Sequence, residues 1–235
     1  MGVVLILNNE KFDIKDVSER KNSKKDVISL KYLFYKFNYR VEIVQNPTLK
    51  DIRDNLNDLL IEHLKKATCL IVVLMTHGLE NDRAYAKDQI YNIGEEILKS
   101  NAFQDFKDLP KILIVQACKS FDVKPKSESK ISKVYNTLRY NSCFEGGKAV
   151  RADDGTLFIQ KLCNNLLKYG LSEDFERIAD RVNKEFEEEF KLSGIRQCPT
   201  IVRYNVVGFE KFYLGDNVKN AFSLKENTNT KFIVG

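Results

Sequence analysis

Apolar residues form short continuous runs in some stretches of the chain and recur at three- and four-residue intervals in others. Continuous or alternating runs are typical of strands, whereas the spaced pattern predicts helices that bury one face. The predicted strands are 1–7, 39–45, 70–75 and 111–116, and the predicted helices between them are 23–37 and 48–67. This alternation of strands and helices favours an α/β fold with a mostly parallel central sheet and helices on both faces.

The remaining segments contain one polar stretch, which is followed by a return to the helical pattern. Lys, Ser, Pro and Glu dominate 119–139, which is therefore predicted as a linker. The other expected elements are a short helix near 94–100 within the irregular segment 79–110, helices at 156–169 and 172–190, strands at 197–205 and 209–214, and a polar tail at 216–235. The buried faces of the predicted helices are expected to include Leu59 and Phe190.

Composition indicates one ordinary globular domain over residues 1–235. Hydrophobic residues make up 43% and charged residues 30% of the chain, and no apolar run approaches the roughly 20 residues of a membrane helix. The 38 basic and 33 acidic residues leave a net charge of +5 but imply a surface of mixed sign. We therefore expect neither a nucleic-acid partner nor a membrane partner.

The cysteines bear on compartment and on metal binding. They are odd in number and scattered along the chain, at positions 69, 118, 143, 163 and 198. This distribution favours reduced thiols and a cytoplasmic location. No pair has the Cys-x-x-Cys spacing common at zinc sites, so no metal and no other cofactor is predicted.

Two predicted strands end in residues suited to nucleophilic chemistry. The strand 70–75 runs into Thr76-His77-Gly78, and the strand 111–116 runs into Ala117-Cys118. The carboxyl ends of parallel strands line one crevice, so His77 and Cys118 are expected in one site. A neighbouring imidazole would favour the Cys118 thiolate, and the amides of Gly78 and Cys118 could form an oxyanion hole.

The other residues of these types are expected to be structural. His63 lies on the charged side of a predicted helix, which is typical of a surface residue. The remaining cysteines are expected to be small buried side chains. A nucleotide-binding domain is not favoured, because no glycine-rich phosphate loop follows the first strand.

These motifs resemble those of the caspases. Gln116-Ala117-Cys118-Lys119 matches in part the family signature of Gln-Ala-Cys, a basic or polar residue and Gly, and His77 precedes Cys118 by 118 − 77 = 41 residues. Thr76-His77-Gly78 resembles the family's Ser-His-Gly. The resemblance extends over 2–214 and includes the opening Gly2 to Asn9, Asp154 to Gln160, Arg181-Val182-Asn183 and Arg196-Gln197-Cys198-Pro199.

The resemblance implies a three-layer caspase-like fold and a cysteine endopeptidase that cleaves after Asp, in apoptosis or innate immune signalling. Residues 1–118 would resemble the large subunit and 140–215 the small subunit. Cys118 would be the nucleophile and His77 the acid/base. Arg20, Gln116 and Arg151 would bind the substrate carboxylate, a role that suits two guanidinium groups and an amide. The implied partners are protein substrates and a second copy of the chain or another caspase, as a dimer.

Departures from the family pattern leave an alternative open and mark the chain as a divergent or insect-type member. Ser120 stands where the signature has Gly, and 145–152 lacks the family's Pro-Gly-Tyr and the aromatic pair before the Arg. The only Asp between 119 and 152 is Asp122, close to the nucleophile. The alternative is an inactive caspase homologue, a decoy that regulates an active caspase by heterodimerisation.

Overall fold

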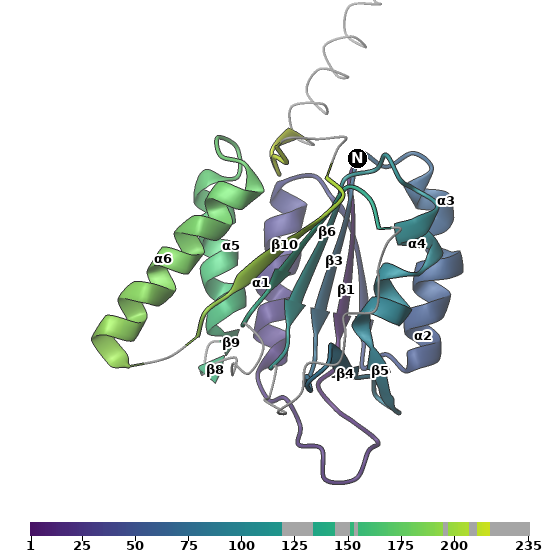
Figure 1. The fold of residues 1–235 in the computed structure, drawn as a ribbon, viewed down its shortest axis with the longest axis horizontal. Coiled ribbons are helices and arrows are strands. Elements are labelled where there is room, and N and C mark those ends of the chain that lie inside the picture. Colours follow the sequence, from purple (N-terminus) through teal and green to yellow (C-terminus); the bar gives the residue numbers. More distant parts are fainter. Residues whose placement is uncertain (119–133, 144–150, 153–154, 195–196, 207–210, 217–235) are drawn as a thin grey trace, which may run out of the picture.

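The computed structural model describes residues 1–118, 134–143, 151–152, 155–194, 197–206 and 211–216. Its centre is a six-stranded sheet (Figure 1) with the order β10-β7-β6-β3-β1-β2. The strands are β1 (Val3–Asn8), β2 (Arg40–Gln45), β3 (Leu70–Met75), β6 (Lys111–Gln116), β7 (Thr137–Asn141) and β10 (Thr200–Tyr204). Only β10 pairs antiparallel among these strands, so the predicted α/β fold with a mostly parallel sheet is confirmed.

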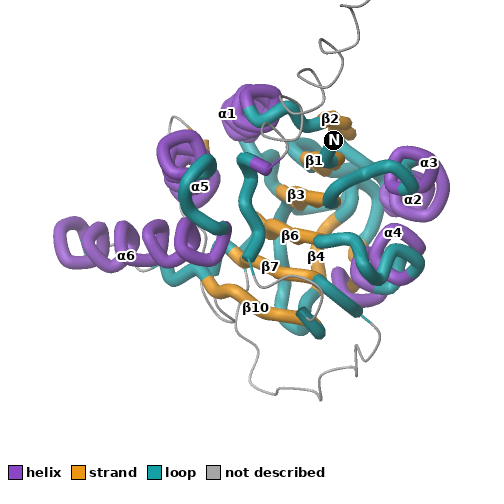
Figure 2. Tube along the Cα trace, turned by 90° about the horizontal axis from the view of Figure 1, so that it is seen from above, coloured by secondary structure: helices purple, strands orange, loops and turns teal. Residues whose placement is uncertain are grey.

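Helices cover both faces of the sheet, as Figure 2 shows. One face carries α1 (Ser23–Lys36), α5 (Leu157–Tyr169) and α6 (Phe175–Ser193). The other carries α2 (Leu49–Asp54), the π-helical η1 (Asn55–Leu59) and η2 (Gly94–Leu98), α3 (Ile61–Leu64) and α4 (Asn101–Gln104). Every residue of β1, β3 and β6 is buried because both faces of these strands are covered. This sandwich explains why their sequences are continuous apolar runs.

The predicted helix 48–67 is interrupted by the π-helical segment η1. Helix α2, the first part of this segment, begins with a capping box. The Thr48 side chain accepts a hydrogen bond from the Asp51 amide, and the Asp51 carboxylate accepts one from the Thr48 amide. The wider turn of η1 shifts the helical spacing, so Leu59 is 63% exposed while Leu56 and Leu60 are buried. The prediction that Leu59 faces the core is therefore wrong.

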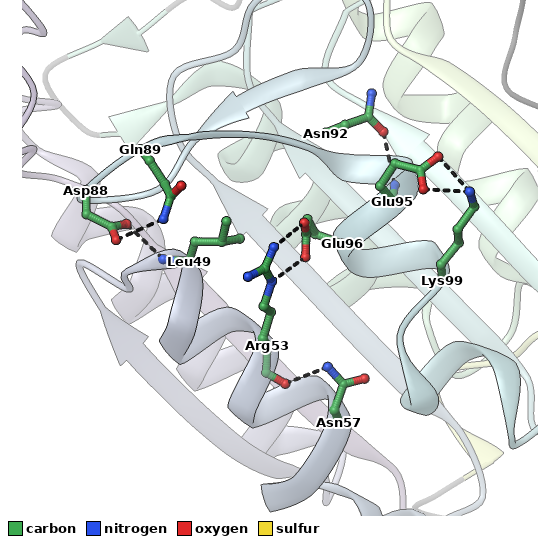
Figure 3. Close-up of polar contacts among 9 residues, drawn as sticks. All are labelled: Leu49, Arg53, Asn57, Asp88, Gln89, Asn92, Glu95, Glu96 and Lys99. Carbon is green, nitrogen blue, oxygen red and sulfur yellow. Dashed lines mark hydrogen bonds and ion pairs between the residues drawn. The ribbon is translucent and has the colours of Figure 1, made fainter.

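An ion pair joins the helical elements of this layer. The guanidinium of Arg53 on α2 donates from two nitrogens to both carboxylate oxygens of Glu96 on η2, each at 2.7 Å (Figure 3). Both residues lie at the surface, so this pair orients the helices more than it stabilises them.

The second half of the chain departs from the sequence prediction in three places. Strand β7 begins at Thr137, inside the predicted linker 119–139, and 119–133 lie outside the described residues. Residues 211–214 form no strand, because their backbone instead bonds helix ends: the carbonyl of Phe212 accepts from the amide of Phe175 at 2.7 Å. Phe190 is 43% exposed, because α6 extends beyond α5 (Figure 1).

Two short strand pairs complete the fold. The irregular segment 79–110 contains a hairpin that the sequence did not predict, β4 (Arg83–Tyr85) with β5 (Ile90–Asn92). The other pair is β8 (Arg151–Ala152) with β9 (Gly155–Thr156). Both pairs lie at the carboxyl end of the parallel strands (Figure 1). No helix in the described part of the chain has the length and apolar character needed to cross a membrane.

Candidate active site

The ends of β3 and β6 bring the predicted His and Cys segments together. The two strands pair in parallel with Met75 opposite Gln116, and the amide of Thr76 donates to the Gln116 carbonyl at 3.1 Å. Gly78 then packs against the backbone of Cys118. A Cβ at Gly78 would lie 2.0 Å from the Cys118 carbonyl oxygen, so only glycine permits this approach.

A pocket of about 230 Å³ opens at this end of the sheet. It is lined by Ser18, Glu19, Arg20, Thr76, His77, Gln116, Ala117, Cys118 and Thr156. Four of the six predicted site residues thus share one cavity, and Gly78 lies directly against it. The sixth, Arg151, pairs through its backbone with Thr156 of the pocket wall, and its side chain lies outside the described residues.

The imidazole of His77 has a defined orientation. Its Nε2 lies 2.8 Å from the carbonyl oxygen of Ser18, a distance that fits an Nε2–H donor. The ring packs against Phe12, with centroids 5.2 Å apart, and against the edge of Tyr85 at 6.5 Å. A neutral imidazole that donates from Nε2 keeps its lone pair on Nδ1, which leaves Nδ1 available to accept a proton.

The β4–β5 hairpin holds the His77 loop in place. The amide of Tyr85 donates to the His77 carbonyl at 3.0 Å, and the hydroxyl of Thr76 donates to the Tyr85 carbonyl at 2.6 Å. The Asp82 carboxylate, in the same loop, receives a bidentate ion pair from Arg139 of β7. The loop is therefore fixed from both halves of the chain.

Arg20 is buried rather than solvated. Its side chain is 1% exposed, and Nη1 donates to the Asn8 side-chain oxygen at 3.3 Å and to the Asn9 carbonyl at 2.8 Å. These two acceptors are neutral oxygens, and they hold the guanidinium at the pocket wall. A buried cation at a pocket wall favours an anionic ligand.

Gln116 contributes an amide to the same wall. Its side chain is 3% exposed, and within the described residues its Oε1 has no hydrogen-bond partner. Buried polar atoms of folded proteins are nearly always paired, so this amide oxygen could accept a hydrogen bond from a ligand that enters the pocket.

Asp26 ties helix α1 to the pocket wall, a role that its position in the first turn of a helix did not reveal. Its carboxylate accepts from the Thr156 amide at 2.9 Å, from the Thr156 hydroxyl at 2.9 Å and from Gln160 at 2.8 Å. Gly155 has φ +116° and leaves no room for a Cβ beside Asp26. Burial raises the pKa of Asp26, although these hydrogen bonds and the nearby Arg20 charge oppose the rise.

The cysteines differ in their environments. All five are free thiols, and Cys69, Cys143 and Cys163 are buried as expected, whereas Cys198 is exposed, contrary to expectation. Burial raises the pKa of Cys69 to about 11 and raises that of Cys163 further, which disfavours their thiolates. Cys118 is half-buried and lines the pocket. Within the described residues, no cluster of His, Cys, Asp and Glu could hold a metal ion.

Comparison with known proteins identifies the family. A sequence model of the caspase domain matches residues 1–208. The chain belongs to the caspase family. Similar proteins include caspase-3 of Mus musculus, 27% identical over 230 residues that cover 86% of this chain and 80% of the relative. Caspase-1 of Equus caballus is 26% identical over 246 residues, covering 90% of this chain and 58% of that protein.

The solved structures support the same fold. The crystal structure of caspase-1 from Spodoptera frugiperda matches with a TM-score of 0.76 and 22% identity, over 91% of this chain and 89% of that chain. The predicted caspase-like fold is therefore confirmed, and the caspase family is one of cysteine proteases. Of the departures noted in the sequence, Ser120 and 145–150 lie outside the described residues. The roles of the individual site residues stay predictions.

Proposed function

We propose that this caspase-family chain is a cysteine endopeptidase that cleaves peptide bonds after aspartate. The observation that carries the proposal is the shared pocket, which brings a thiol and an imidazole together with a buried guanidinium and an amide. The first two groups suit acyl transfer, and the last two suit recognition of a small carboxylate. The proposed setting is the cytoplasm, in cell death or innate immune signalling.

In the proposed mechanism His77 accepts the Cys118 thiol proton at Nδ1, and the thiolate attacks the carbonyl carbon of the substrate Asp. The amides of Gly78 and Cys118 would donate to the oxyanion of the tetrahedral intermediate. The intermediate collapses to a thioester as His77 gives its proton to the leaving amine. Water, deprotonated by His77, then hydrolyses the thioester and restores the thiol.

Substrate selection would depend on the cationic wall of the pocket. Arg20 is held by hydrogen bonds to Asn8 and Asn9, so its guanidinium would be preoriented toward a carboxylate. The amide of Gln116 would supply a further hydrogen bond, and Arg151 a second guanidinium. A Glu side chain is one methylene longer and would fit this rigid clamp less well than Asp.

Dimerisation is proposed for the open edge of the sheet at β10. This strand ends the strand order, pairs only with β7 among the described strands, and has Val202 39% exposed. An unpaired edge of this kind can add a strand from a second copy or from another caspase. Protein substrates with Asp at the cleavage site and a homodimeric or heterodimeric partner are thus the proposed interactions.

The proposal is tested with fluorogenic peptides that end in Asp, with and without citrate to promote dimers. Turnover is expected for the wild type and for Cys198→Ala, an exposed cysteine that does not line the pocket, and is expected to vanish for Cys118→Ala. Arg20→Ala is expected to lower kcat/KM for these peptides about 10- to 100-fold through loss of charge-assisted hydrogen bonds. Normal cleavage by Arg20→Ala would refute the assigned carboxylate clamp.

The same assay addresses the decoy alternative. A wild-type protein that stays silent in every condition, yet binds an active caspase, would overturn the protease proposal in favour of a regulatory homologue. Thermal unfolding of each variant serves as the folding control, because only a variant that melts like the wild type isolates chemistry from stability.

A further inference from the structure

The pocket is not wholly cationic, because Glu19 also lines it. Its side chain is exposed, and within the described residues it has neither a hydrogen bond nor an ion pair. The Asp26 carboxylate, by contrast, is buried and accepts a hydrogen bond from the Thr156 amide. Glu19 therefore presents to the pocket an exposed carboxylate that forms no ion pair with any described residue.

The neighbours of Glu19 fix its place relative to a bound substrate. Ser18, the preceding residue, holds Nε2 of His77 through its carbonyl, and Arg20, the following residue, forms the carboxylate wall. In the proposed reaction His77 protonates the departing amine from Nδ1, so the amine leaves beside the imidazole, in the pocket that Ser18 and Glu19 also line. The residue joined to that amine, which follows the cleaved bond, would then lie next to Glu19.

We propose that Glu19 selects the substrate residue after the cleaved bond, favouring Lys or Arg there and disfavouring Asp or Glu. The inference rests on the proposed protease function and adds a second point of charge recognition to it. Arg20 would bind the negatively charged substrate residue before the cleaved bond, and Glu19 would attract a positively charged residue after it. A substrate with an acidic residue on both sides of the bond would be selected against.

The size of the effect follows from the exposure of Glu19. Ion pairs at a solvated surface are weak, so exchange of a neutral residue for Lys is expected to raise kcat/KM only about two- to five-fold. A Glu at the same place is expected to lower it by a similar factor. Because water and salt screen exposed charges, the preference should shrink when the ionic strength is raised from low salt to about 1 M, where the Debye length is about 3 Å.

The test uses three internally quenched peptides that are identical except for Lys, Gly or Glu immediately after the Asp. The readout is the ratio of kcat/KM for the Lys peptide to that for the Glu peptide, so a general loss of activity cancels. For the wild type this ratio is expected to be about 4 to 25. It should fall toward 1 in Glu19→Gln and below 1 in Glu19→Lys.

A matched control separates local from overall charge. Glu187→Gln makes the same charge change at an exposed position of α6 that does not line the pocket, and should keep the wild-type ratio. If the wild type cleaves the peptides but Glu19→Gln keeps its ratio, the inference is wrong while the proposed function stands. If the wild type cleaves none of the three, the proposed function fails and the inference fails with it.

Discussion

At the scale of single residues, the pocket depends on charged groups whose burial is offset by hydrogen bonds. Arg20 reaches neutral oxygens of Asn8 and Asn9, and Asp26 accepts from Thr156 and Gln160. In both cases the hydrogen bonds oppose the cost of burying the charged form. Arg20, which is proposed to bind the substrate carboxylate, is thus held in place by Asn8 and Asn9.

Asp26 should leave a signature in the pH dependence of stability. Burial raises the pKa of this carboxyl in the folded protein, so between the unfolded and folded values the native state binds more protons. The free energy of unfolding contributed by Asp26 therefore falls as the pH rises from about 4 through the folded value. We expect the wild type to lose stability relative to Asp26→Asn over this interval, measured by urea unfolding from pH 4 to 7.

Asp51 provides a control of opposite sign. Hydrogen bonds from Thr48 lower the pKa of Asp51, so its contribution to stability is present above the unfolded value and is lost as the pH falls. Relative to Asp51→Asn, the wild type should gain stability as the pH rises through about 4. A gain relative to Asp26→Asn as well would show that hydrogen bonding outweighs burial at Asp26.

At the scale of elements, strand β7 fixes the loop that carries His77 and Gly78. The guanidinium of Arg139 is 3% exposed and is shared between Asp82 of that loop and the Asn141 side chain. Breaking a buried ion pair from one side leaves an uncompensated charge, which is more costly than replacing both partners. The pair therefore links the stability of β7 to the geometry of the site.

Arg139→Met is expected to lower the free energy of unfolding by about 3 kcal/mol, because Asp82 keeps a largely buried charge without its partner. The double variant Arg139→Met with Asp82→Asn should recover part of this loss, since the unpaired charge is gone. Urea unfolding of the two single variants and the double variant forms a cycle that isolates the interaction.

The control is Arg181→Met on α6, which breaks a solvent-exposed pair with Glu173 and should lower the free energy of unfolding much less than Arg139→Met does. Equal decreases in the free energy of unfolding for Arg139→Met and Arg181→Met would show that the buried pair is no more important for stability than the exposed one. A further check is kcat, which should fall in Arg139→Met if the loop loses its position.

The elements that were predicted well are those whose pattern is set by burial on the sheet. Strands β1, β3 and β6 are covered on both faces, so their apolar runs identify them. Strand β7 was missed because Arg139 and its polar neighbours look like linker, and only the distant Asp82 explains how they are buried. The exposure of Leu59 follows from a π-helical turn, which no local spacing predicts.

The site residues also differ in whether the sequence pattern alone could predict them. Parallel strands deliver their carboxyl ends to one edge, so His77, Cys118 and Gln116 could be placed together from the sequence. Arg20 and Arg151 came only from resemblance to caspases, because they lie outside those strands. Glu19, Phe12 and Asp26 gave no signal, since their roles depend on contacts between segments far apart in the chain.

At the scale of the whole molecule, the two halves of the chain form one core. Strand β7 pairs with β6 across the gap in the described residues, and Thr156 completes a pocket that is otherwise built from residues before 119. On the face of α1, Leu30 and Phe34 share a hydrophobic cluster with Phe158 and Phe175. We therefore expect the halves to stay associated without a covalent link between them.

A cut between the halves is accordingly expected to leave them associated. We would insert a site for a sequence-specific protease between 119 and 133, cut the chain, and pass it over a size-exclusion column. The pieces should elute together at the position of the uncut protein, and Phe158→Ala should release them because the cavity costs about 3–5 kcal/mol. Phe190→Ala, at an exposed position, should not. Separate elution of the wild-type pieces would show that the chain connection, rather than the shared core and sheet, holds the pocket together.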